Sequence, residues 1–192
     1  MQSLSIEGAQ DYLRKIGMKI GAWNEICYIE TLQSEEPAWI RCRAPKDARE
    51  LYVFSQYVAG WLPGGSWKIF QVDNSTSLSV DESYLFCRLV GIENYIEFSE
   101  GMPCRTFLLE SADGFDLDLS FNLMMANIIY IFLLFEGHGH LVSSGSRSGE
   151  KIGVQDGFVY FSSGREGLSR AKQSMADFES NPLMLPEWVR LT

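Results

Sequence analysis

The sequence predicts an α+β fold in which helices pack against an antiparallel or mixed β-sheet, and three observations support this. Apolar residues recur at helical spacing in some segments and alternate with polar residues in others. The alternating segments are short, and turn sequences that suit hairpins join several of them. The chain of 192 residues has the length of one domain. We therefore expect a single α+β domain over residues 1–192.

Three helices are expected in the first ninety residues. Apolar residues at helical spacing predict one over 5–16 and a second over 46–61, and a glycine that can end the helix follows each. A third is expected over 79–90, because Ser79 and Glu82 have the spacing of a capping box ahead of an apolar run.

Strands are expected between these helices. Runs of β-branched and aromatic residues predict strands over 26–29 and 38–43, with an acidic loop between them, and a longer strand over 66–73. Trp61 and Trp67 bracket the Pro-Gly-Gly turn before the longer strand. This segment predicts a tightly packed helix–strand unit, and the two tryptophans would be the anchors if it instead bound a ligand.

The second half of the chain is predicted to form hairpins around one apolar helix. Strands over 106–109 and 115–119 flank an Asp-Gly turn. The most apolar stretch, 121–135, has 15 residues, fewer than the roughly 18 to 20 that cross a bilayer, so we expect a buried helix and no membrane contact. The remaining elements are three strands and a C-terminal helix, over 141–143, 151–154, 158–162 and 166–179.

The cysteines and the N-terminus indicate where the protein works. Four cysteines, Cys27, Cys42, Cys87 and Cys104, are widely spaced and have apolar neighbours, which is typical of reduced thiols in a core. The first ten residues have neither the basic start nor the apolar centre of a signal peptide. Both observations favour a reducing cytoplasm.

The net charge of −9 is concentrated in one segment. Residues 92–118 hold seven acidic residues and one basic residue, and so carry −6 of the −9. Binding to nucleic-acid phosphates depends on lysine and arginine, so this balance argues against a nucleic-acid partner. A concentrated negative charge favours a basic protein partner.

The two histidines of the chain offer the main candidate for metal chemistry. On a strand, His138 and His140 would share a face, and Glu136 is the nearest further ligand. We interpret them instead as turn residues beside glycines, with a small metal-assisted enzyme as the alternative. The segment Gly145–Lys151 matches neither the P-loop nor the nucleophile-elbow pattern. No catalytic residue and no cofactor are predicted.

The character of the whole chain, together with the block WLPGGSWKIFQVDNSTSLSVDE, resembles the small immunity proteins of bacterial contact-dependent growth-inhibition and polymorphic toxin systems. The resemblance implies a cytoplasmic inhibitor that binds a cognate toxin, often a basic nuclease, and occludes its active site. An adaptor or structural protein is a further alternative, and the oligomeric state stays open.

The acidic segment supplies the predicted binding face. Carboxylates there would compete for surfaces built to receive phosphates and would accelerate association. Asp116 and Asp118 would share one face of the strand predicted over 115–119. The predicted partner-binding residues, with two aromatic anchors among them, are Glu93, Tyr95, Glu97, Glu100, Asp113, Phe115, Asp116 and Asp118.

Overall fold

The computed structural model describes residues 2–23, 26–32, 38–73, 88, 104–110, 117–147 and 149–178. Among these residues, seven strands form one antiparallel sheet. Their spatial order is β1 (Gln2–Leu4), β6 (Cys104–Glu110), β5 (Trp67–Asp73), β7 (Gly139–Ser143), β8 (Lys151–Gln155), β9 (Phe158–Ser163) and β4 (Ala38–Arg43). The predicted α+β fold with an antiparallel sheet is confirmed.

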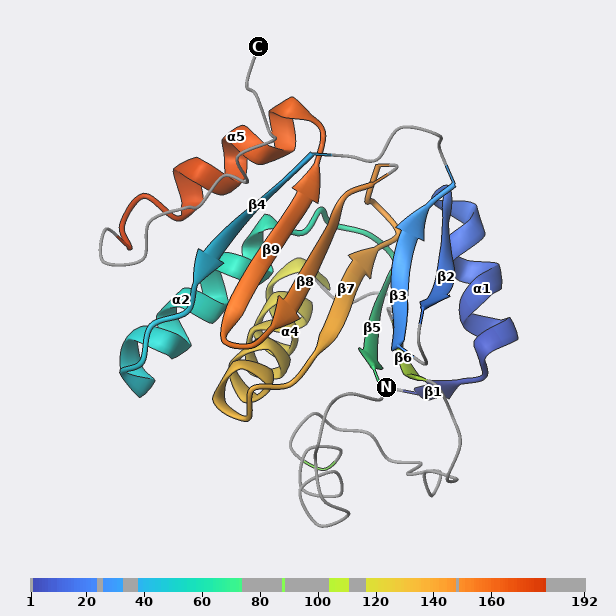
Figure 1. The fold of residues 1–192 in the computed structure, drawn as a ribbon, viewed down its shortest axis with the longest axis horizontal. Helices are drawn as coiled ribbons and strands as arrows, with labels where there is room; N and C mark the ends of the chain where they lie inside the picture. The colour runs from blue at the N-terminus through green and yellow to red at the C-terminus, as the bar shows by residue number, and fades with distance from the viewer. Residues whose placement is uncertain are drawn as a thin grey trace.

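The described helices and a second, two-stranded sheet divide between the two faces of the main sheet (Figure 1). On one face lie α2 (Ala48–Trp61), α4 (Leu117–Leu134) and α5 (Arg165–Ser174). On the other lie α1 (Ile6–Lys15) and the hairpin of β2 (Met18–Trp23) and β3 (Ile26–Thr31).

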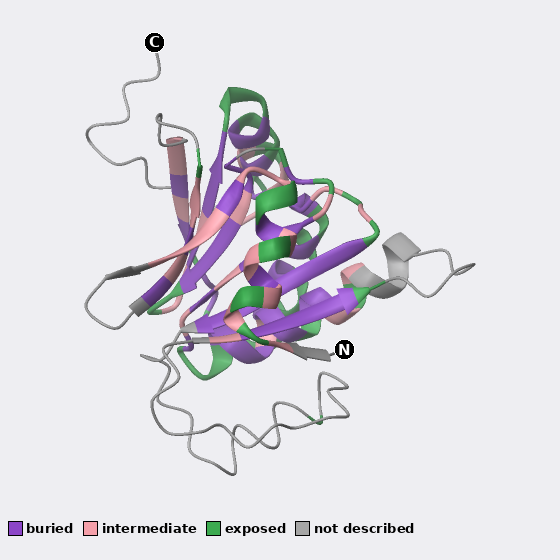
Figure 2. Ribbon diagram, turned by 90° about the vertical axis from the view of Figure 1, so that its right-hand side faces the viewer, coloured by how far each residue is buried: buried purple, intermediate pink, exposed green. Residues whose placement is uncertain are grey.

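The larger core lies between the sheet and the helices α2, α4 and α5. Its largest fully buried hydrophobic side chains, Phe54, Phe70, Phe132 and Phe161, are each at most 1% exposed. Figure 2 shows that most described strand residues are buried, as expected of a sheet covered on both faces over much of its area. The smaller cluster, between the sheet and α1 with its hairpin, centres on Ile69.

Local sequence signals explain where the first helices begin and end. The Ser5 side chain accepts a hydrogen bond from the Gly8 amide and caps α1, and Gly17 follows the helix at φ 72°. The Asp47 carboxylate caps α2 by accepting from the amides of Arg49 and Glu50. The helices predicted over 5–16 and 46–61 are therefore confirmed.

The helix α4 confirms one prediction and overturns another. The helix predicted over 121–135 forms, but α4 spans Leu117–Leu134, so the strand predicted over 115–119 is wrong at residues 117–119. Residues 115 and 116 and the Asp-Gly turn of the predicted hairpin lie outside the described residues. The alternating sequence there resembles a strand, yet Leu117 and Phe121 continue the helical spacing of the residues that follow, and an acidic residue in the first turn favours a helix. No described helix combines the length and apolar character that a bilayer crossing requires.

Other predictions had the right elements with different bounds or partners. The strands predicted over 26–29 and 38–43 form, but they belong to different sheets. The C-terminal helix ends at Ser174, earlier than the predicted residue 179. The helix expected over 79–90 lies outside the described residues, apart from Arg88, which is helical. The single domain over 1–192 stays a prediction.

Candidate functional site

One half of a sheet face lacks a covering element among the described residues. The hairpin strand β3 contacts β5 and β7 and is bonded to β8 through Lys151, and α1 contacts β6, whereas no described helix or strand lies over the same face of β9 and β4 (Figure 1). We call the side chains that β4 and β9 present there the open face. They are Trp39, Arg41, Arg43, Phe158 and Tyr160.

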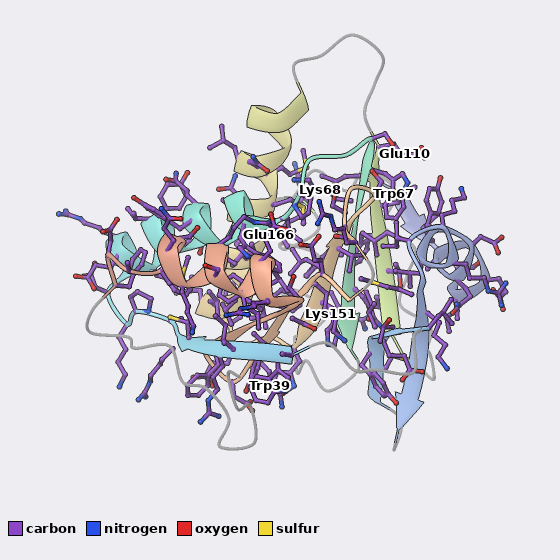
Figure 3. All side chains as sticks on the ribbon, turned by 90° about the horizontal axis from the view of Figure 1, so that it is seen from above. Trp39, Trp67, Lys68, Glu110, Lys151 and Glu166 are labelled. Carbon is purple, nitrogen blue, oxygen red and sulfur yellow. The ribbon has the colours of Figure 1, made fainter. Side chains whose placement is uncertain are left out.

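Strand alternation places these five side chains on the uncovered side. Ile40 and Cys42 of β4 and Val159 and Phe161 of β9 belong to the core beneath the helices, so the residues between them point the other way. Figure 3 shows Trp39 on the side of β4 opposite α5. Burial in the core also raises the pKa of the Cys42 thiol to about 11, so it stays protonated.

The open face is a continuous aromatic surface with two guanidinium groups. The Tyr160 ring lies 5.5 Å from the Trp39 ring and 6.5 Å from the Phe158 ring, measured between centroids. The guanidinium carbons of Arg41 and Arg43 lie 5.0 Å and 5.9 Å from the centroid of the Phe158 ring, within reach of cation–π attraction. Tryptophan, tyrosine and arginine are the residues that contribute most at protein interfaces.

The predicted acidic face lies almost entirely outside the described residues. Only Asp118 falls within them, and it lies in the first turn of α4 instead of on the predicted strand. The remaining predicted binding residues are outside the description, and their role stays a prediction: Glu93, Tyr95, Glu97, Glu100, Asp113, Phe115 and Asp116.

The alternative metal site does not form. In the described part of the chain, no three histidine, cysteine, aspartate or glutamate side chains lie close enough to hold a metal ion. His138, just before β7, instead places its Nε2 atom 2.8 Å from Oδ1 of Asp156, which lies in the turn between β8 and β9. Glu136 is exposed just beyond the end of α4, at φ 52°.

His140 belongs to a row of polar residues that crosses three neighbouring strands. Gln71 on β5 lies directly opposite Thr106 on β6 and His140 on β7, so all three side chains share the hairpin-covered face. Gln71 is 0% exposed and Thr106 is 3% exposed. Neither side chain has a hydrogen-bond partner, and neither does the buried Nδ1 atom of His140. We call these three residues the polar row.

The environment of His140 keeps its ring neutral. Burial is the main cause and the nearby Lys151 charge is the second, and together they lower the His140 pKa to about 3. Lys151 itself donates a hydrogen bond from Nζ to the carbonyl of Ile29 and thereby ties β8 to the hairpin. At neutral pH the polar row therefore carries no charge.

Lys68, a second buried polar residue of β5, has a hydrogen-bond partner, as buried polar groups usually do. Lys68 points to the helix side of the sheet and is 1% exposed, and its Nζ donates a 2.9 Å hydrogen bond to Asn122 Oδ1 of α4. A paired polar group of this kind is typical of a folded core. Gln71, three residues further along the same strand, has no such partner.

The loop between β7 and β8 does not resemble a phosphate site. The Arg147 amide donates to Glu150 Oε2 at 2.9 Å, and Glu150 Oε1 also accepts from Arg170 at 3.1 Å. The Glu150 carboxylate therefore already accepts the hydrogen bond of the Arg147 backbone amide, which a phosphate would need. At Gly145, an added Cβ would lie 1.8 Å from the carbonyl oxygen of Gly64, so close packing between loops requires this glycine.

The chain matches no protein-family model, and the comparisons with curated proteins and with solved structures gave no significant match. The resemblance to immunity proteins therefore stays a prediction. Sequence reasoning missed the open face, although a signal was present: Trp39, Arg41 and Arg43 alternate with Ile40 and Cys42 in a predicted strand.

Proposed function

We propose that this protein is a cytoplasmic inhibitor of the immunity class, and that it binds a cognate protein toxin through the open face. The observation that carries this proposal is the aromatic surface of Trp39, Phe158 and Tyr160, which lies on the face of β4 and β9 that no described element covers. An aromatic surface with arginines at its edge has the composition of an interface centre.

The charges of this chain suit a partner that is basic as a whole and has a local acidic or carbonyl-rich surface. The exposed guanidinium group of Arg43 suits carboxylates or backbone carbonyls of the partner. The net charge of −9 attracts a basic protein over longer distances and raises the association rate. A basic nuclease domain with a local acidic or carbonyl-rich contact surface fits both requirements.

The experiment is a growth assay built on the neighbouring genes. The tagged chain is used to purify a binding protein encoded beside it, and that protein is then expressed with and without the chain. We expect the binding protein to stop growth and the wild-type chain to restore it. The double variant Trp39→Ala/Tyr160→Ala should bind about 100-fold more weakly, since each interface anchor contributes on the order of 2 kcal/mol or less, and should not restore growth.

A matched control separates the open face from surface aromatics in general. Tyr52 lies on α2, which packs on the opposite face of the sheet, and is 39% exposed. Tyr52→Ala should restore growth as well as the wild type does. A double variant of the open face that neutralises fully would disprove the proposal, and binding to a protein that is not toxic would indicate an adaptor instead.

A further inference from the structure

The buried polar atoms without partners gather at one place. Among the described residues, the buried side-chain nitrogen and oxygen atoms that lack a hydrogen bond are four in number, and all belong to the polar row. They are the two amide atoms of Gln71, Oγ1 of Thr106 and Nδ1 of His140. Folded proteins pair nearly all such atoms, so a cluster of unpaired ones indicates a missing partner.

The next row of the sheet on the same face supplies no partner. It consists of the apolar residues Leu108, Ile69 and Val142, followed on β8 by Lys151, whose Nζ donates to the Ile29 carbonyl. Along the polar row itself, Leu4 lies opposite Thr106 and Gly153 lies opposite His140. The apolar side chains beside the row cannot donate or accept a hydrogen bond, and the four atoms have no partner elsewhere among the described residues.

We infer that the polar row binds an uncharged molecule whose hydrogen-bonding group both donates and accepts, as a primary carboxamide does. Gln71 offers a donor and an acceptor, Thr106 offers a hydroxyl that can act as either, and His140 offers one ring nitrogen. The row itself holds no ionised group, and the nearby Lys151 ammonium already donates to the Ile29 carbonyl, so burial disfavours an ionic ligand. This inference does not depend on the proposed function.

Access to the row lies at the edge of the open face. His140 is only half-buried, and the next residue of the sheet is Gly153, which places no side chain between His140 and Tyr160. A Cβ added at Gly153 would lie 3.7 Å from His140 Cδ2 and 3.5 Å from Tyr160 Cβ. His140, half-buried as a whole residue, thus lies between Gln71 and the edge of the open face.

The test compares two probes of nearly the same shape, acetamide and acetate, by NMR titration of the full chain. We expect acetamide to shift the backbone amide signals of residues 71, 106 and 140 with saturation, and acetate to bind at least tenfold more weakly. Thr106→Val, which preserves shape, and Gln71→Leu should each weaken acetamide binding at least tenfold. Two variants are used so that a folding defect in one does not decide the outcome.

A matched control variant is Ser55→Ala. Ser55 is also buried, but its hydroxyl donates to the Leu51 carbonyl within α2 at 2.8 Å, so its loss should leave acetamide binding unchanged. The inference is overturned if acetamide produces no saturable shift, if acetate binds equally, or if the variants bind as the wild type does. Water-to-amide cross-peaks at Gln71 without any response to acetamide would show that water alone fills the row.

Discussion

The two halves of one sheet face have the same strand geometry and differ in their cover. Under α1 and the β2–β3 hairpin, Ile69 is 0% exposed and Trp67 is 8% exposed, and both pack in an apolar cluster. On the open half, Trp39 and Tyr160 pack against each other and stay half-buried. Aromatic residues in the covered half are explained by the core, whereas those in the open half lie outside both core clusters.

Replacing a covered residue should have the largest effect on stability. Ile69→Ala removes a fully buried side chain and leaves a cavity, so the free energy of unfolding should fall by about 2–5 kcal/mol. Urea unfolding followed by circular dichroism measures this. A loss below about 1 kcal/mol would mean that the hairpin does not bury this half of the sheet, and the contrast between the covered and open halves would be disproved.

Acid should destabilise the protein through His140, at the boundary of the two halves. The unfolded imidazole has a pKa of 6.5 and the folded one about 3, so stability is fully present above pH 6.5 and is lost as pH falls from there toward 3. The loss is up to about 1.4 kcal/mol per pH unit, or roughly 2 kcal/mol between pH 6.5 and pH 5.

The control for this prediction is the variant His140→Gln, which removes the buried imidazole. Unfolding free energies of both proteins are compared from pH 7 to pH 4.5, and the other titrating groups, His138 included, are common to both. The wild type should lose more stability than the variant over this range. Parallel curves would show that the His140 ring is solvated and that the boundary lies elsewhere.

Replacing an open-face residue should affect stability much less. Trp39→Ala removes a half-buried side chain and one ring contact, so the free energy of unfolding should change by about 1 kcal/mol or less. Measured beside Ile69→Ala in the same urea series, it sharpens the contrast between the halves. A loss of about 3 kcal/mol or more would place Trp39 in the core.

The smallest change is expected at the polar row. Thr106→Val keeps the shape and removes a buried hydroxyl without a partner, so the variant should be as stable as the wild type or slightly more stable in the absence of ligand. The paired hydroxyl of Ser55 provides the contrast, because Ser55→Ala should cost about 1 kcal/mol. Thermal unfolding of both variants measures the difference, and equal losses would contradict it.

Local patterns predicted much of the fold and little of the site. Helical spacing and caps located α1 and α2 because those signals lie within a few residues of each other. The strand predicted over 115–119 was wrong at residues 117–119, because five alternating residues resemble a strand when the longer helical spacing after them is ignored. The strands β1 and β2 were not predicted, since β1 has three residues and β2 contains a lysine and a glycine.

The polar row could not be predicted from the sequence. Gln71, Thr106 and His140 are far apart in the chain, and only the pairing register of three strands brings them together. Strand order is not encoded in local turn signals, which is why the sequence also failed to separate β3 from β4. Part of the open face could have been predicted from the sequence, because Trp39, Arg41 and Arg43 alternate with the core residues Ile40 and Cys42. That no described element covers this face can be seen only in the folded sheet.

The most direct test of the central claim is oxidative footprinting of the tryptophans and tyrosines, with and without the cognate toxin. In the protein alone, Trp39 and Tyr160 should be oxidised and Trp67 should be protected. In the complex, Trp39 and Tyr160 should become protected, while the exposed Tyr52 on α2 should not change. Equal oxidation of Trp39 and Tyr160 in both states would show that the open half of the sheet is not the binding surface.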